Sequence, residues 1–183
     1  MSVKSPEPTF HVPPPRHKGG RLIFLDFDGV LHPESVYLLH KRGPILLNAP
    51  GHRLFEHCVL LEQVLEPYPD VRIVLSTSWV RRYRGSIARV SNRLTPHLRA
   101  RVVGATYHSG MDPEQFAAAP RGMQVWSDVL RRKPDAWLAL DDDWLHWPAW
   151  CREQLVRTDP MLGISEPSVL EELKMKLAKP YER

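Results

Sequence analysis

Acidic side chains follow two apolar runs of this 183-residue sequence at the point where each run ends. Asp26 and Asp28 follow LIFL and are succeeded by Gly29, and a DDD run occupies positions 141–143 after WLAL. One carboxylate at such a place can face a substrate while its neighbour reaches the leaving group. Clustered carboxylates also repel one another, so several at one point are typical of a site for a hard cation. Mg²⁺ fits this pattern, because it takes oxygen ligands, often one or two carboxylates together with a substrate phosphate.

Each acidic motif taken alone has a simpler interpretation. An isolated Asp-x-Asp is commonly a solvated turn or a helix cap, and an isolated DDD run is commonly an acidic loop. Both motifs end apolar runs, however, and the polar run Ser76-Thr77-Ser78 ends a third run, VRIVL. We therefore favour a common site that brings the three together.

Short apolar runs alternate along the chain with segments of helical periodicity. Leu54, Cys58, Leu61 and Leu65, for example, share one helical face. The pattern predicts strands at 22–26, 71–76, 100–106, 136–141 and 153–158. It predicts helices at 54–65, 80–94, 123–130 and 167–177.

This alternation predicts an α/β fold, a Rossmann-like parallel sheet of about five strands with helices on both faces. Such sheets bind ligands beyond the carboxyl ends of their strands, where the strand order reverses. Asp26, Asp28, Ser76, Thr77 and Asp141 stand at or just after the ends of predicted strands. We therefore expect them to meet at one edge of the sheet.

Three motifs resemble those of the haloacid dehalogenase (HAD) superfamily of phosphohydrolases. LDFDGVL at 25–31 resembles the first motif, IVLSTSW at 73–79 the second and LALDDD at 138–143 the fourth. The resemblance spans about residues 21–178. Within the superfamily, VLSTSW, RGMQVW and WLALDDDW are together similar to the HAD domain of bacterial Swiss Army Knife RNA-repair proteins.

The resemblance implies a catalytic role for each matching residue. Asp26 would be the nucleophile that forms an aspartyl-phosphate. Asp28 would protonate the leaving oxygen and then deprotonate the attacking water. Thr77 would hydrogen-bond the oxygens of the transferred phosphoryl group, and Ser76 is the competing choice, because the alignment of STS is ambiguous by one residue.

The resemblance also implies Mg²⁺ as the cofactor. Asp141 would bind the ion, with Asp142 as a further ligand or as a support for the ligands. Asp26 would bind it as well, and Asp28 would contribute its backbone carbonyl.

The third motif of the superfamily normally supplies a Lys that bridges the nucleophile and the phosphoryl group. Here the predicted helix after the third strand opens with PRG, so Arg121 is the candidate and departs from Lys. Lys133 is the alternative, but it stands near the far end of that helix. The simpler interpretation of Arg121 is an ordinary exposed residue at a helix start.

Positive charge is concentrated in the middle of the chain. The stretch 71–111 holds eight arginines and no acidic residue, in a chain whose net charge is +4. Arg82, Arg89 and Arg93 would form a stripe along the predicted helix 80–94. Such a stripe could hold the backbone phosphates of a nucleic acid, although a solvated helix face is the simpler interpretation.

The remaining features of the sequence concern domain organisation and cellular compartment. Residues 1–20 are proline-rich and predict a flexible tail, and 21–183 predict the HAD-like domain. Segments 32–52 and 107–119 are too short for a separate cap domain, so we expect a capless enzyme. No secretory signal or membrane span is visible, and the two isolated cysteines give no disulfide framework, so we expect a cytoplasmic protein.

The sequence thus predicts a Mg²⁺-dependent phosphohydrolase that forms an aspartyl-phosphate and acts on phosphorylated substrates, with phosphorylated polynucleotide ends as one class. The alternative is a catalytically weak or inactive HAD-fold module that binds nucleic acid.

Overall fold

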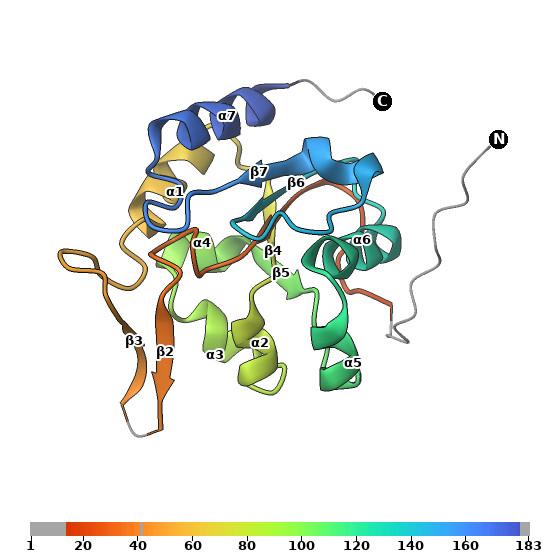
Figure 1. Ribbon diagram of the computed structural model, residues 1–183. Helices are drawn as coiled ribbons and strands as arrows, with labels where there is room; N and C mark the ends of the chain where they lie inside the picture. Colours follow the sequence, from red (N-terminus) through yellow and green to blue (C-terminus); the bar gives the residue numbers. More distant parts are fainter. Residues whose placement is uncertain (1–13, 41, 180–183) are drawn as a thin grey trace.

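A five-stranded parallel sheet forms the centre of the protein in the computed structural model, which describes residues 14–40 and 42–179 (Figure 1). The strand order is β5-β4-β1-β6-β7, and β2 and β3 form a separate antiparallel hairpin. The strands are β1 (Arg21–Leu25), β2 (Val36–Leu39), β3 (Gly43–Leu46), β4 (Arg72–Leu75), β5 (Val102–Ala105), β6 (Ala136–Asp141) and β7 (Leu155–Arg157).

The order of the strands places β1 in the middle, hydrogen-bonded to β4 on one side and β6 on the other. The chain runs outward from β1 to β4 and β5, and then returns to the other side of β1 for β6 and β7. The winding therefore reverses at β1, and the carboxyl ends of β1, β4 and β6 lie together at this reversal.

Helices cover both faces of the sheet because its strands are apolar on both sides (Figure 1). Ile23 and Leu25 of β1 pack into the larger core with α1, α4 and α7, whereas Leu22 and Phe24 pack into the smaller core with α6 and η1. The helices are α1 (Cys58–Leu65), α2 (Ser78–Arg82), α3 (Ile87–Ser91), α4 (Pro96–Arg101), α5 (Pro113–Ala118), α6 (Arg121–Arg132), the 3₁₀ helix η1 (Ala149–Gln154) and α7 (Pro167–Ala178).

The predicted fold class is confirmed, but several predicted elements are wrong in detail. The strand predicted at 153–158 begins at Leu155, after η1, and the helix predicted at 54–65 begins at Cys58. The strand predicted at 100–106 begins only at Val102, because α4 occupies the residues before it.

The single helix predicted at 80–94 is two short helices, α2 and α3. Arg84 and Gly85 take left-handed φ values of 54° and 81° between them, and the Ser86 side chain accepts from the Arg89 N–H to cap α3.

The segments in which a cap was considered hold only small elements. Segment 32–52 forms the β2–β3 hairpin, and 107–119 contains the six-residue α5. Within the described residues the domain is therefore capless, as predicted.

Only part of the predicted N-terminal tail is described. Residues 1–13 lie outside the described residues. Further along, the Gly19 N–H donates to the Arg132 carbonyl at 2.9 Å, and the Gly20 N–H donates to Asp135 Oδ2 at 2.8 Å. In the described part of the chain, no helix has the length and apolar character needed to cross a membrane.

Candidate active site

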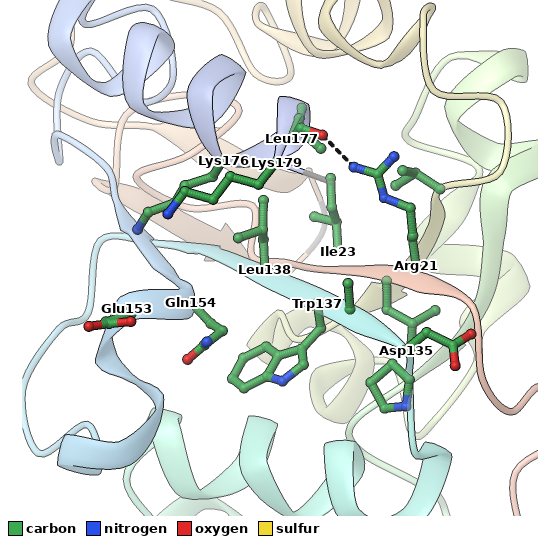
Figure 2. Close-up of a pocket in the computed structure, with 14 residues that line it drawn as sticks. Arg21, Ile23, Asp135, Trp137, Leu138, Glu153, Gln154, Lys176, Leu177 and Lys179 are labelled. Atoms are coloured by element: carbon green, nitrogen blue, oxygen red, sulfur yellow. Dashed lines mark hydrogen bonds between the residues drawn. The ribbon is translucent and has the colours of Figure 1, made fainter. Parts of the chain in front are cut away.

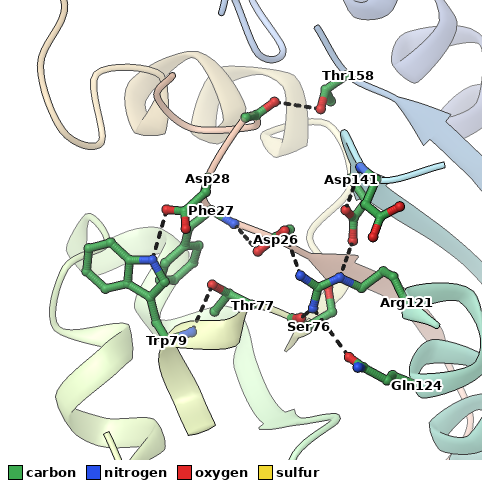
Figure 3. Close-up of polar contacts among 12 residues, drawn as sticks. Asp26, Phe27, Asp28, Ser76, Thr77, Trp79, Arg121, Gln124, Asp141 and Thr158 are labelled. Carbon is green, nitrogen blue, oxygen red and sulfur yellow. Dashed lines mark hydrogen bonds and ion pairs between the residues drawn. The ribbon is translucent and has the colours of Figure 1, made fainter. Parts of the chain in front are cut away.

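The polar residues at three neighbouring strand ends converge, as the sequence predicts (Figure 3). Asp26 follows β1, Ser76 follows β4 and Asp141 ends β6. The backbone ladder continues through them, since the Ser76 N–H donates to the Leu25 carbonyl at 2.9 Å and the Asp26 N–H donates to the Leu140 carbonyl at 3.1 Å. These hydrogen bonds hold the three strand ends at one level.

Asp26, Asp141 and Asp142 form a compact carboxylate cluster. They each offer an oxygen within 4.8 Å of the others, and the first two are buried. Gly29 makes room for Asp142, because a Cβ at position 29 would overlap the Asp142 carboxyl group. Gly29 also has a φ of 70°, a conformation that a residue with a side chain rarely adopts.

Arg121, the first residue of α6, ties this cluster together (Figure 3). Its Nη2 lies 3.1 Å from Asp26 Oδ2, and its Nε lies 3.1 Å from Asp141 Oδ2. Its Nη1 donates to the Ser76 carbonyl. Lys133, the alternative considered from the sequence, caps the opposite end of α6, so the structure brings Arg121 and not Lys133 to the site.

Burial is the largest influence on the acidic groups and raises the pKa of all three. The pKa of Asp26 is raised and that of Asp141 is raised well above its usual range, although Arg121 opposes both shifts. Burial, helped by repulsion from Asp26, raises the pKa of Asp142 to about 7. Burial disfavours the charge of Arg121 as well, but Asp26 and Asp141 outweigh it, so the Arg121 pKa is raised. One guanidinium therefore does not offset three crowded carboxylates.

The cluster fits a divalent cation with oxygen ligands. Asp141 Oδ2 is buried beside Arg121, yet it accepts no hydrogen bond from any described residue. A cation would supply the missing positive charge, and Asp26, Asp141 and Asp142 could hold it. The Asp28 side chain is not part of the cluster, so its predicted ligand role would fall to its backbone carbonyl.

Asp28 points instead toward an aromatic wall (Figure 3). Its Oδ1 accepts from the Trp79 indole N–H at 2.9 Å and lies 3.1 Å from His32 Nε2. Its side chain is 22% exposed, in contrast to the 5% of Asp26, so the second carboxylate is the one that faces outward. His32 follows the first motif and Trp79 ends the second, but the resemblance assigns a role to neither of them.

The structure separates the two candidates of the second motif. The Thr77 side chain lowers the pKa of Asp26 and so opposes the rise that burial causes, and its Oγ1 accepts from the Trp79 backbone N–H at 3.3 Å. Ser76 Oγ is buried without a hydrogen-bond partner among the described residues. Thr77 is therefore the hydroxyl beside the predicted nucleophile, and Ser76 contributes its carbonyl to Arg121.

A cleft of about 380 Å³ adjoins the cluster. Arg121 and Gln124 line it on the α6 side, Arg81 lines it from α2, and Asp143 and His146 line it from the loop after β6. The cleft therefore offers a second cation, Arg81, beside the carboxylates.

The arginine stripe predicted on one helix is wrong in its geometry. Arg82 ends α2, Arg89 lies in α3 and Arg93 follows it, with the left-handed turn at 84–85 between the first two. All three are exposed, and the Arg89 guanidinium lies 4.6 Å from the centre of the Tyr83 ring.

A larger cavity, of about 700 Å³, lies at the amino ends of the strands, away from the site (Figure 2). Two of its cationic groups, Lys176 and Arg21, are engaged within the protein. Lys176 donates to the Leu155 carbonyl at 2.8 Å and lies 2.7 Å from Glu172, and Arg21 donates to the Leu177 carbonyl. We therefore place the chemistry at the opposite edge of the sheet.

Comparisons with known proteins identify the family of the chain. A family model described as the HAD domain in Swiss Army Knife RNA repair proteins matches residues 22–169. The match contains all three strand ends of the site together with Arg121. Searches of curated proteins and of solved structures gave no significant match. The extent of the family match shows that the chain belongs to the HAD domains of Swiss Army Knife RNA repair proteins.

Proposed function

We propose that the protein is a Mg²⁺-dependent phosphohydrolase that works through an aspartyl-phosphate on Asp26. The observation that carries the proposal is the buried cluster of Asp26, Asp141 and Asp142 at the reversal point of the sheet, with Arg121 paired to Asp26. Membership of a HAD family supports hydrolase chemistry of this type.

The proposed reaction has two displacements at phosphorus. A carboxylate oxygen of Asp26 attacks the phosphorus, the bond to the leaving oxygen breaks, and Asp28 donates a proton to that oxygen. Asp28, now a carboxylate, then removes a proton from a water molecule that attacks the phosphorus. The bond between Asp26 and phosphorus breaks, and inorganic phosphate leaves.

The surrounding residues stabilise charge and fix positions. Arg121 is oriented by Asp26, Asp141 and the Ser76 carbonyl, so its charge needs no reorganisation as negative charge shifts among the phosphoryl oxygens. Thr77 lies beside Asp26, where its hydroxyl can donate to one of those oxygens. Mg²⁺ held by Asp26, Asp141 and Asp142 would screen the substrate phosphate from the nucleophilic carboxylate.

Phosphate release tests the proposal against its alternative. We expect the wild-type protein to release phosphate from p-nitrophenyl phosphate in Mg²⁺, and we expect EDTA and Asp26→Asn each to abolish the release. Asp70→Asn is the matched control and should stay active, because the Asp70 side chain is exposed before β4, at the opposite edge of the sheet. If the chelated protein or the Asp26→Asn variant remained fully active, the proposed mechanism would be wrong. If the wild-type protein bound nucleic acid and released no phosphate, the inactive binding module would be the better description.

For the substrate we propose the phosphorylated end of a polynucleotide. The description of the family as a domain of RNA repair proteins supports this class. So does the capless site, because it leaves room for the end of a long chain. Arg81 in the adjoining cleft, with exposed Arg82, Arg89 and Arg93 beyond it, would meet the backbone phosphates.

The salt dependence of oligonucleotide binding tests this substrate class. When a protein neutralises Z phosphates of a single strand, the logarithm of its binding constant falls against the logarithm of the salt concentration with a slope of about −0.7Z. We expect steep salt dependence for an oligonucleotide with a terminal phosphate, and a flatter slope in the Arg82→Glu, Arg89→Glu double variant. Turnover of p-nitrophenyl phosphate by that variant should barely change. Oligonucleotide turnover that is insensitive to both salt and these reversals would contradict the proposal.

A further inference from the structure

Two nitrogen atoms converge on a single oxygen of Asp28. The Trp79 indole Nε1–H donates to Oδ1 at 2.9 Å, and His32 Nε2 lies 3.1 Å from the same oxygen. The other oxygen of this carboxylate, Oδ2, accepts no hydrogen bond from any described residue. The two oxygens of this carboxylate are therefore in different environments.

The backbone determines which nitrogen of His32 carries the proton. The Phe55 N–H donates to His32 Nδ1 at 3.2 Å, so Nδ1 is an acceptor and the proton of the neutral ring lies on Nε2, which faces Asp28. Phe55 has a φ of 62°, a conformation that is uncommon for an aromatic residue. This turn directs its N–H at the imidazole, and His32 is fully buried.

Aromatic packing fixes the second donor. The Trp79 ring lies against Phe27 at 5.8 Å and Phe55 at 5.4 Å between ring centres, and the Phe27 and Phe55 rings lie 5.2 Å apart. Trp79 is only 2% exposed, so its indole has little freedom to turn away. The polar edge of this buried indole is thus held against Asp28.

We propose that His32 and Trp79 are positioning residues that make Oδ2 the proton-transferring atom of Asp28. The N–H groups of Trp79 and His32 both face Oδ1, so a proton on Oδ1 would be repelled by both. The proton of the acid form therefore resides on Oδ2. The inference rests on the proposed function, because it assigns an atom to the general acid. It concerns residues outside the carboxylate cluster and Arg121.

Leaving groups of different basicity report on this role. An alkoxide must be protonated as it leaves, whereas p-nitrophenolate leaves readily without a proton. The ratio kcat/KM covers only the steps up to departure of the leaving group, so it isolates the acid role of Asp28 from its later base role. A misplaced acid should therefore slow an alkyl phosphate much more than p-nitrophenyl phosphate.

The primary variant is Trp79→Phe, which removes the N–H and keeps an aromatic ring. General acid catalysis contributes about 10²–10⁴-fold, so we expect kcat/KM for glycerol phosphate to fall by about 10-fold or more. We expect less than about a threefold fall for p-nitrophenyl phosphate. The matched control is Trp126→Phe, because Trp126 Nε1 has no hydrogen-bond partner among the described residues. The Trp126→Phe variant should keep the wild-type kcat/KM for both substrates.

A second pair of variants keeps the test decisive if Trp79→Phe is poorly folded. His32→Leu removes the donor to Asp28, and His32→Gln can replace the imidazole Nε2–H with an amide N–H. We expect His32→Leu to lower kcat/KM for glycerol phosphate much more than for p-nitrophenyl phosphate. We expect His32→Gln to restore kcat/KM for glycerol phosphate. Equal losses on both substrates, or no loss on either, would overturn the inference. A wild-type protein with no Mg²⁺-dependent release from either substrate would instead contradict the proposed function itself.

Discussion

Arg121 occupies the place where the resemblance implies a Lys, and its shape explains what that exchange achieves. A lysine offers one compact charge, whereas a guanidinium offers several N–H groups in a planar fork. Here the fork reaches Asp26, Asp141 and the Ser76 carbonyl together. A single side chain from α6 thus joins the ends of β1, β6 and β4.

Removal of the guanidinium should therefore lower activity. We expect Arg121→Ala to lower kcat by at least ~10²-fold, as for the loss of one preorganised donor. Arg121→Lys should fall between this variant and the wild type, because it keeps the charge and loses the fork. Lys133→Ala is the control at the far end of α6. If Lys133→Ala were the more damaging substitution in steady-state kinetics, Arg121 would not be the phosphoryl-binding cation.

The crowded carboxylates predict a linkage between pH and Mg²⁺. The pKa of Asp142 is raised from 3.8 to about 7 in the folded chain, so its protonated form favours folding below about pH 4, and this stability is lost as the pH rises toward 7. Mg²⁺ bound by the deprotonated carboxylates, as we propose, would restore the lost stability.

We therefore expect Mg²⁺ to raise the melting temperature more at pH 8 than at pH 5. Asp142→Asn should reduce this difference, and Asp143→Asn should preserve it. Thermal unfolding with and without EDTA at the two pH values measures the effect. A stabilisation by Mg²⁺ that is equal at both pH values would contradict the linkage.

At the scale of elements, the turn after β1 must bring the backbone of Gly29 against the Asp142 carboxyl group. We expect Gly29→Ala to destabilise the protein and to weaken Mg²⁺ binding, because its Cβ would displace Asp142. Gly43→Ala is the matched control, since Gly43 also has a positive φ of 78° but no described atom lies within 4 Å of the added Cβ. It should cost only the backbone strain of about 1–2 kcal/mol. Equal effects of both variants on Mg²⁺ affinity, measured by titration calorimetry, would show that crowding at Asp142 is unimportant.

The strands of the five-stranded sheet were predictable because they are apolar runs followed by polar residues, and β6 is found at its predicted bounds. The β2–β3 hairpin was not predicted. The helix predicted at 80–94 was wrong because its apolar period continues across Gly85-Ser86. A glycine followed by a serine is a common helix end and a new helix start, and this local signal prevails over the periodicity. The same break separates Arg82 from Arg89.

The candidate site was predictable to the extent that it lies at strand ends. Asp26, Thr77 and Asp141 follow from the topology of a parallel sheet. The hydrogen bond from the Phe55 N–H to His32 does not, because it depends on the left-handed φ of Phe55, 23 residues further along the chain. No spacing in the sequence indicates that turn.

At the scale of the whole molecule, the site opens at one edge of the sheet and the described residues hold no cap domain above it. The β2–β3 hairpin extends from the body of the domain beside this sheet (Figure 1). An open site leaves the size of the leaving group unrestricted, so the chemistry at phosphorus, and not the choice of substrate, is the central claim.

The stereochemical course at phosphorus tests that claim most directly. A thiophosphate monoester made chiral with two oxygen isotopes would be hydrolysed by the wild-type protein in Mg²⁺ and in water that carries the third isotope, and the configuration of the thiophosphate released would be determined. Two successive in-line displacements, the first by Asp26 and the second by water, predict net retention. Inversion would mean that water attacks the substrate directly, and it would contradict an aspartyl-phosphate on Asp26.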